Sequence, residues 1–337
     1  MRSIALALVA PAVVLTFFIA GCGGSDGSDG NGRGSPSGDA DAAPSSDAGA
    51  GLPGIPNRDG GGAPGACSGL LAQPLDAVWT LDSDAGARSY RVHVPASYDP
   101  ARPMPVVLDF HGYTSNGAEE EFLDHMTVKG DAAGFIVVQP DGLNNSWNAG
   151  ACCGQSASSG VDDVGFVGAI VDALEAKLCV DAARVFATGM SNGGFLAQRL
   201  GCELASRIAA IAPVAAVLGV TTCEPSRPMP IMHFHGTADT LVAYDGGQNG
   251  FISVPEDFAA WAKRDACVGD PVETFRKGDA HCSTYATCAG GSEVTLCTID
   301  GGGHTWPGGT PIPTGTTTTN LSATDAMWTF FDAHPRK

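Results

Sequence analysis

Positive charge is scarce in this sequence. The 337 residues contain 18 Lys and Arg against 36 Asp and Glu, which gives a formal net charge of −18 at pH 7. Nucleic acids and anionic polymers are bound by patches of basic side chains. The composition therefore argues against a nucleic-acid partner and against an anionic-polymer ligand. Apart from favouring solubility, the negative charge indicates little about function.

Long hydrophobic runs are scarce as well. The apolar run Ile4–Ile19 is short for a membrane span and is followed by small residues, so residues 1–21 are predicted to be an export signal. The segment Ile19-Ala20-Gly21-Cys22 resembles a bacterial lipobox, in which the cysteine is lipidated and becomes the mature N-terminus. The alternative is an ordinary signal peptide cleaved near Ala20, with Cys22 incidental. Either interpretation predicts an exported protein, anchored by lipid at the cell envelope or secreted.

Large apolar residues are almost absent from the segment after Cys22. Residues 22–66 consist mainly of Gly, Ser, Asp, Ala and Pro. Such a segment cannot bury enough apolar surface to fold, so we predict a disordered acidic tether. The remaining residues, 67–337, have the usual size of one α/β domain.

The cysteines lack a convincing zinc-binding spacing. Without Cys22, ten of the eleven cysteines remain, and an even number in an exported chain indicates up to five disulfides rather than a metal site. Sequence does not determine the pairing. Our hypothesis is Cys202–Cys223, Cys267–Cys288 and Cys282–Cys297, with Cys67 and Cys179 bonded to the adjacent pair Cys152 and Cys153. Adjacent cysteines rarely bridge each other comfortably, which favours two outside partners.

Beyond the tether, short apolar segments alternate with helical patterns. In Val164–Leu178 the apolar residues recur with a period near 3.6, which is typical of a helix. Apolar strands with helices between them predict an α/β fold, with a mostly parallel sheet covered on both faces. The expected strands are Tyr90–Val94, Pro105–Phe110, Phe135–Gln139, Val185–Thr188, Ile208–Pro213, Pro230–His235 and Val294–Ile299. The expected helices are Glu119–Ala133, Val164–Leu178, Asn192–Glu203, Pro255–Ala266 and Ala323–His334.

The turn Gly189-Met190-Ser191-Asn192-Gly193 joins one of these strands to a helix. It matches the nucleophile elbow of α/β-hydrolases, in which glycines allow a tight turn and the serine adopts a strained backbone conformation. Ser191 is therefore the predicted nucleophile, and the backbone N–H of Asn192 at the helix N-terminus is a predicted oxyanion donor. A second match at Gly23–Gly27 has no strand before it and no helix after it.

Asp239 and His304 are the predicted partners of the serine. Asp239 follows strand Pro230–His235, and His304 lies in a glycine-rich loop after strand Val294–Ile299, so the chain order is Ser, Asp, His. The carboxylate would orient the histidine, and the histidine would take the serine proton. The alternative for Asp239 is a turn former or helix cap. The rivals are Asp245 and Asp257 for the acid, and His93, His125, His233, His235, His281 and His334 for the base.

A further oxyanion donor is predicted in the loop after strand Pro105–Phe110. In the sequence His111-Gly112-Tyr113, the small glycine lets the backbone approach the substrate oxygen, and the N–H of Tyr113 or of a neighbour is the predicted donor. We expect His111 to border the substrate and to pack or orient the loop rather than ionise. The alternative is an ordinary tight β-to-α turn.

Several blocks together resemble the exported polyhydroxybutyrate depolymerase and feruloyl esterase group of α/β-hydrolases. The resemblance spans about Tyr90 to Phe331 and implies the α/β-hydrolase fold, a serine esterase without a cofactor, and the triad Ser191, Asp239 and His304. The blocks are Phe110-His111-Gly112, Cys152-Cys153-Gly154, Val161-Asp162-Asp163-Val164, Ala187–Gly194, His233–Asp239 and Gly302–Gly308. Asp162 and Asp163 are interpreted as caps of the following helix rather than catalytic groups.

The resemblance leaves the substrate open. One hypothesis is a feruloyl esterase acting on phenolic esters of plant cell wall polysaccharide, and another is a depolymerase of polyhydroxybutyrate or related short-chain polyesters. A third is a noncatalytic surface protein, against which the intact triad argues. Trp147 and Trp306 are candidate aromatic surfaces for a phenolic group or a sugar, unless neighbouring loops bury them. We expect a monomer whose only contact with a membrane is the N-terminal lipid.

Overall fold

The computed structural model describes residues 67, 70, 72–73, 76–83 and 86–337. The predicted export signal, the lipidation site Cys22 and the tether all lie outside the described residues. The described residues belong to the predicted catalytic domain.

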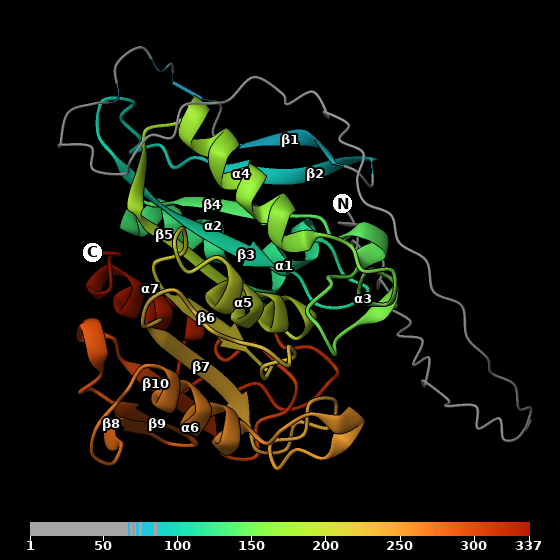
Figure 1. The fold of residues 1–337 in the computed structure, drawn as a ribbon, viewed down its shortest axis with the longest axis vertical. Coiled ribbons are helices and arrows are strands. Elements are labelled where there is room, and N and C mark those ends of the chain that lie inside the picture. Colours follow the sequence, from blue (N-terminus) through green and yellow to red (C-terminus); the bar gives the residue numbers. More distant parts are fainter. Residues whose placement is uncertain (1–66, 68–69, 71, 74–75, 84–85) are drawn as a thin grey trace, which may run out of the picture. The chain divides into compact units, whose positions relative to one another are not determined.

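The domain is built on a sheet of ten strands in the order β1-β2-β4-β3-β5-β6-β7-β10-β9-β8 (Figure 1). The strands are β1 Asp76–Ser83, β2 Gly86–His93, β3 Met104–Phe110, β4 Ile136–Pro140, β5 Val180–Met190, β6 Ile211–Val214, β7 Ile231–Gly236, β8 Val272–Lys277, β9 Ala280–Tyr285 and β10 Val294–Ile299. The central run from β4 to β10 is parallel, and the strands at both edges pair antiparallel. The predicted mostly parallel sheet is confirmed.

Helices cover both faces of this sheet. They are α1 Gly117–Asp124, α2 Met126–Ala133, α3 Gly154–Ser158, α4 Asp163–Lys177, α5 Asn192–Glu203, α6 Val254–Arg264 and α7 Ala323–Ala333. Because side chains alternate along a strand, β3 sends Val106 and Leu108 into the core beneath α4, α5 and α6 and Val107 into the core beneath α2 and α7. Figure 1 shows α4, α5 and α6 in front of the sheet and α7 behind it.

Two features of the fold differ from the prediction. The strands β1, β8 and β9 were not expected; the edge strand β8 carries several charged residues and is mostly exposed, so it lacks the apolar pattern of a core strand. The expected helix Glu119–Ala133 is two helices, broken at His125, which has a left-handed φ of 59°. The break has a local cause, because the side chain of Asp124 accepts a hydrogen bond from Met126 N (2.8 Å) and so starts the second helix.

Five disulfides join the ten described cysteines. The predicted pairs Cys202–Cys223, Cys267–Cys288 and Cys282–Cys297 are confirmed. The prediction for the other four is wrong, because Cys67 bonds Cys179 and Cys152 bonds Cys153. Cys179 directly precedes β5, whereas Cys152 contacts Asn192 just beyond the other end of that strand. An 11-residue strand is far longer than the Cα separation of about 7 Å that a disulfide can span.

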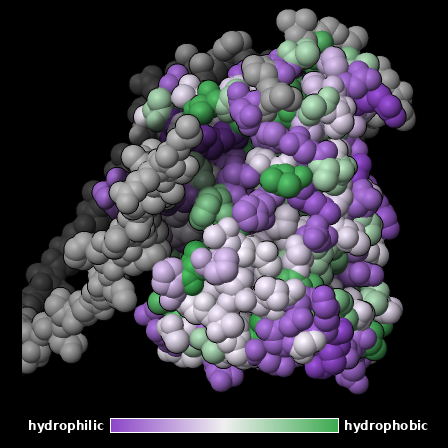
Figure 2. All heavy atoms as spheres, turned by 180° about the vertical axis from the view of Figure 1, so that it is seen from behind, coloured by the Kyte–Doolittle hydropathy of each residue, from purple (hydrophilic) through white to green (hydrophobic). Residues whose placement is uncertain are grey.

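The disulfides fit an exported protein, since such bonds persist in oxidising compartments. Within the described part of the chain, no helix combines the length and the apolar character needed to cross a bilayer. The face opposite to that of Figure 1 shows isolated apolar residues among polar ones (Figure 2). Scattered exposed apolar residues of this kind are normal on a protein surface.

Candidate active site

Ser191 occupies the turn between β5 and α5 with φ 54° and ψ −121°. A positive φ is rare for a residue with a side chain and indicates a strained backbone held by its surroundings. The surroundings are tight: a Cβ atom on Gly193 would lie 1.8 Å from the carbonyl oxygen of Phe110, at the end of β3. Only glycine fits there, so the start of α5 packs directly on the backbone of the neighbouring strand.

Asn192, whose backbone N–H is an oxyanion donor predicted from the sequence, is the first residue of α5. Because Asn192 begins the helix, its backbone N–H has no partner within the helix. Its side chain is fully buried and bonded to the backbone of Trp147, accepting from Trp147 N (2.7 Å) and donating to Trp147 O (3.0 Å). This amide bridge ties the helix start to the loop after β4, and no sequence pattern indicated it.

Asp239 and His304 are in contact, as the predicted triad requires. Nδ1 of His304 lies 2.8 Å from Oδ2 of Asp239, and both side chains are buried. The other oxygen, Oδ1, accepts the N–H groups of Leu241 and Val242, each at 2.9 Å. Burial opposes ionisation of Asp239, but hydrogen bonds from His235 and His304 outweigh it and lower its pKa below the ordinary value. The carboxylate is thus ionised and holds the Nδ1–H tautomer of His304.

The loop after β3 lies against the elbow. A Cβ atom on Gly112 would lie 3.7 Å from Cβ of Ser191, so the backbone of this loop borders the serine directly. His111 is fully buried; its Nδ1 donates to Gly112 O (2.7 Å) and its Nε2 accepts from Gly142 N (2.9 Å). Burial lowers the pKa of His111, so the ring is neutral and orients two loops.

The structure corrects the interpretation of the two tryptophans. Both Trp147 and Trp306 are 0% exposed, so neither ring offers a surface to a substrate. Trp147 Nε1 donates to His111 O (2.9 Å), and Trp306 Nε1 donates to Thr324 Oγ1 (3.0 Å). An indole buries well when its one N–H finds an acceptor, which is the case for both.

The exposed aromatic residue beside the elbow is Tyr113. Its side chain is 46% exposed, and its ring covers Gly154, where a Cβ atom would lie 2.5 Å from Tyr113 Cε2. Tyr113 was predicted as a backbone donor, and the position of its ring was not foreseen. Gly154 follows the Cys152–Cys153 disulfide, so this disulfide lies next to the exposed ring.

The rival acids Asp245 and Asp257, and the predicted helix caps Asp162 and Asp163, lie in other surroundings. Asp245 is exposed, Asp162 caps α4 by accepting from Gly165 N (2.8 Å), and Asp163 pairs with Arg88 (2.7 Å). Asp257 is fully buried and accepts from Gln198 Nε2 (2.8 Å). Asp239 is therefore the acid that holds His304, at 2.8 Å.

Asp257 provides a prediction about stability. Burial raises its pKa to about 7, partly offset by the hydrogen bond from Gln198. A protein in which a carboxyl has a higher pKa in the folded than in the unfolded state becomes less stable as pH rises, here between about pH 4 and 7. We expect the free energy of unfolding of Asp257→Asn to depend less on pH, with a difference from wild type of up to about 4 kcal/mol over this interval. Denaturant unfolding at pH 5 and pH 7 measures it; the exposed Asp245→Asn is the control, and parallel slopes for wild type and Asp257→Asn would contradict the assignment.

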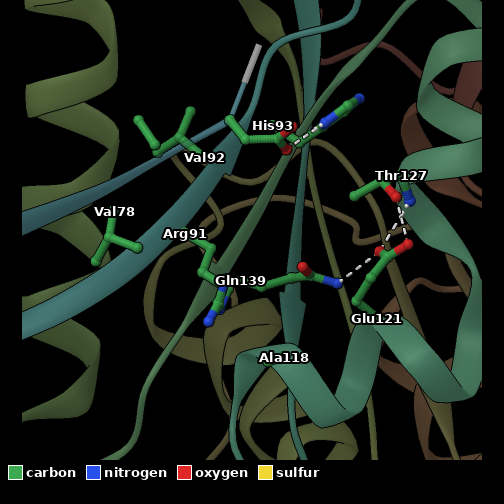
Figure 3. A pocket seen from close by; sticks show the side chains of 10 residues that line it. Val78, Arg91, Val92, His93, Ala118, Glu121, Thr127 and Gln139 are labelled. Atoms are coloured by element: carbon green, nitrogen blue, oxygen red, sulfur yellow. Dashed lines mark hydrogen bonds and ion pairs between the residues drawn. The ribbon is translucent and has the colours of Figure 1, made fainter. Parts of the chain in front are cut away.

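A hollow of about 310 Å³ lies away from the elbow, between β1, β2 and helices α1 and α2 (Figure 3). Apolar and polar residues both line it, the polar ones including Arg91, His93, Glu121 and Gln139. Neither Ser191 nor His304 lines it. The reacting groups therefore meet substrate elsewhere, at the carboxyl edge of the sheet where parallel strands collect functional groups.

Known proteins share sequence similarity with most of the described domain. Residues 88–249 match the family model described as Esterase PHB depolymerase. The chain is also 31% identical over 271 residues to "Putative esterase NocK" of Nocardia uniformis subsp. tsuyamanensis, covering 72% of this chain and 78% of that protein. The chain belongs to the PHB depolymerase esterase family. The family resemblance predicted from the sequence is thus confirmed.

Two further proteins resemble this chain, one in sequence and one in structure. Feruloyl esterase B of Piromyces equi is 32% identical over 234 residues, which cover 64% of this chain but only 42% of that protein. The solved acetyl xylan esterase from Aspergillus awamori superposes with a TM-score of 0.55 at 14% identity, over 76% of this chain and 99% of that one. The structural likeness supports the α/β-hydrolase fold alone.

Proposed function

We propose that this family member is a serine esterase with Ser191 as nucleophile, His304 as general base and Asp239 as the group that orients the histidine. Two observations carry the proposal: Ser191 has a positive φ at the strand-to-helix turn, and the buried side chains of Asp239 and His304 are in contact at 2.8 Å. Strain at a turn is retained where the surroundings enforce it, and such sites cluster at active centres.

The reaction follows from the donors and acceptors already described. Nε2 of His304 takes the proton of Ser191 Oγ as the oxygen attacks the ester carbonyl, and the Asp239 carboxylate stabilises the imidazolium that forms. The N–H groups of Asn192 and Tyr113 hold the tetrahedral oxyanion. His304 then gives the proton to the leaving alcohol, and water releases the acyl group from Ser191 by the same steps. The proposed reaction requires no cofactor.

For the substrate we propose feruloyl or similar phenolic esters of plant cell wall polysaccharide. Two observations support this choice. The relative from Piromyces equi is named a feruloyl esterase. Tyr113 is exposed and directly follows Gly112, whose backbone borders Ser191, so its ring is available to stack on a phenolic acyl group. The alternative, a polyhydroxybutyrate depolymerase, is supported by the description of the matching family.

Initial rates on three substrates distinguish these alternatives. The full chain is assayed on methyl ferulate, on p-nitrophenyl acetate and on amorphous polyhydroxybutyrate, with Tyr113→Ala as the matched variant. We expect the wild type to prefer methyl ferulate. We also expect Tyr113→Ala to lower kcat/KM on methyl ferulate about tenfold, because one ring-stacking contact contributes roughly 1 kcal/mol or more. Clearing of the polyester with slow ferulate turnover would establish the depolymerase instead.

We further propose that Cys22 carries the lipid that anchors the exported chain. The five disulfides support export but do not bear on the lipid. Growth of the expressing bacterium with a labelled fatty acid should label the wild-type chain and leave Cys22→Ser unlabelled. Equal labelling of the two would refute the anchor.

A further inference from the structure

Two buried histidines of β7 lie next to the acid of the proposed triad. His233 and His235 are two positions apart on this strand, so their side chains lie on one face of the sheet, and they are 2% and 1% exposed. The reaction proposed above makes no use of either ring. Because buried polar groups are costly unless they are hydrogen-bonded, the partners of these rings indicate what the rings do.

Both ring nitrogens of His235 have partners. Nε2 lies 2.8 Å from the carbonyl oxygen of Val242, and because a carbonyl can only accept, Nε2 carries a proton and donates it. Nδ1 is hydrogen-bonded to Nε2 of His233 at 3.1 Å. The contacts therefore fix the orientation of the ring and the proton on Nε2.

Val242 connects His235 to the carboxylate of Asp239 through its two main-chain groups. Its carbonyl oxygen accepts from His235, while its N–H donates to Oδ1 of Asp239 at 2.9 Å. The N–H of Leu241 donates to the same carboxylate oxygen, also at 2.9 Å. His235 thus ties the turn that binds the carboxylate to strand β7.

The other carboxylate oxygen, Oδ2 of Asp239, has two imidazole neighbours. Nδ1 of His304 lies 2.8 Å from it, and Nε2 of His235 lies 3.4 Å from it. A protonated ring nitrogen so close to a carboxyl favours its ionised form, which is the form that orients His304. His235 therefore acts on both oxygens of Asp239, on one through Val242 and on the other by proximity.

Packing leaves the ring of His235 little freedom to turn. The ring of Tyr244 lies 6.0 Å away at an angle of 73°, and the Tyr244 hydroxyl is hydrogen-bonded to Oγ1 of Thr298 on β10 at 3.0 Å. On the other ring nitrogen, His233 is buried in turn against α6, where Oδ2 of Asp257 lies 3.7 Å from its Nδ1. A group that must hold another within a fraction of an ångström needs such support.

We propose that His235 is a positioning residue for the esterase reaction, because its Nε2–H holds the carbonyl of Val242 and thereby keeps the Asp239 carboxylate in place against His304. The inference rests on the proposed function. A misplacement of about 1 Å at a reacting centre can cost on the order of 10²-fold in rate, so a side chain that touches no substrate can still control kcat.

The test compares two substitutions of His235 in the full chain. His235→Gln keeps an N–H donor that can reach the Val242 carbonyl, whereas His235→Leu has a similar volume and no donor. Both remove the bond to His233, so the difference between them reports the contact made by Nε2. On p-nitrophenyl acetate we expect His235→Leu to lower kcat about 100-fold with less than about threefold change in KM, and His235→Gln to stay within about fivefold of wild type. Fluorophosphonate labelling to completion counts the active sites, so that kcat refers to folded enzyme.

His93 provides the matched control, because it is also a strand histidine in contact with carboxylates. Its Nδ1 lies 2.9 Å from Asp76 and its Nε2 lies 3.1 Å from Asp131, and the strands β4, β3, β5 and β6 lie between its strand β2 and β7. His93→Leu should keep the wild-type kcat. Wild-type kcat in His235→Leu, or an equal loss in His235→Leu and either His235→Gln or His93→Leu, would overturn the proposal. Inactive wild type would instead overturn the esterase function itself.

A measurement on the wild type covers the case in which the His235 variants do not fold. Nitrogen NMR spectra of the histidine rings show which ring nitrogen carries a proton. The proposal requires a proton on Nε2 of His235, and this proton should exchange slowly with solvent because the residue is 1% exposed. A His235 ring without a proton on Nε2 would overturn the proposal.

Discussion

Ser191→Ala is expected to lower kcat on any ester substrate by about 10⁶-fold, to the level left by binding and the oxyanion donors alone. The alanine has no oxygen to attack the carbonyl, and the fold should persist because the substitution removes one partly exposed atom. The measurement is kcat with p-nitrophenyl acetate, together with labelling by a fluorophosphonate probe.

Ser25 is the natural control for this result, because the segment Gly23–Gly27 has the same spacing of glycines around a serine. Ser25→Ala should retain full activity and full labelling. Residual labelling of Ser191→Ala at the wild-type rate would show that another residue is the nucleophile.

Asp239→Asn should lower kcat by about 10⁴-fold, since an asparagine can donate a hydrogen bond to Nδ1 of His304 and so stabilise the wrong tautomer. Nε2 would then carry the proton and could not act as the base toward Ser191. The loss should shrink at high pH if hydroxide can replace the base, and a pH profile of kcat/KM measures this. Asp245→Asn is the exposed comparison, and an equal loss in both variants would contradict the special role of Asp239.

The contact of Asp239 with His304 and the parallel sheet were accessible from the sequence because each depends on a local pattern. Gly189 and Gly193 flank Ser191 at the spacing of a strand-to-helix turn, and Asp239 and His304 each follow a predicted strand. Parallel strands bring such loops to one edge of the sheet, so chain order and position were sufficient. The geometry of Asp239 and His304 agrees with that reasoning.

Other features depend on contacts between distant segments, and the sequence could not reveal them. Whether Trp147 is exposed depends on the loop after β3, which supplies the acceptor of its indole N–H. The partner of Cys179 depends on which end of β5 it occupies. Glu120 lies in an acidic stretch of three glutamates that is typical of a solvated helix face, and only the tertiary structure turns one of them inward.

The contact between Gly193 and the Phe110 carbonyl has a consequence for how this enzyme can change. Since no side chain stands between the two segments, the spacing of nucleophile and oxyanion loop is determined by main-chain atoms. Exposed side chains near this contact, such as the proposed substrate-binding Tyr113, can then be exchanged without altering that spacing. Substitutions at exposed positions are therefore expected to change which acyl group is accepted while the position of Ser191 stays the same.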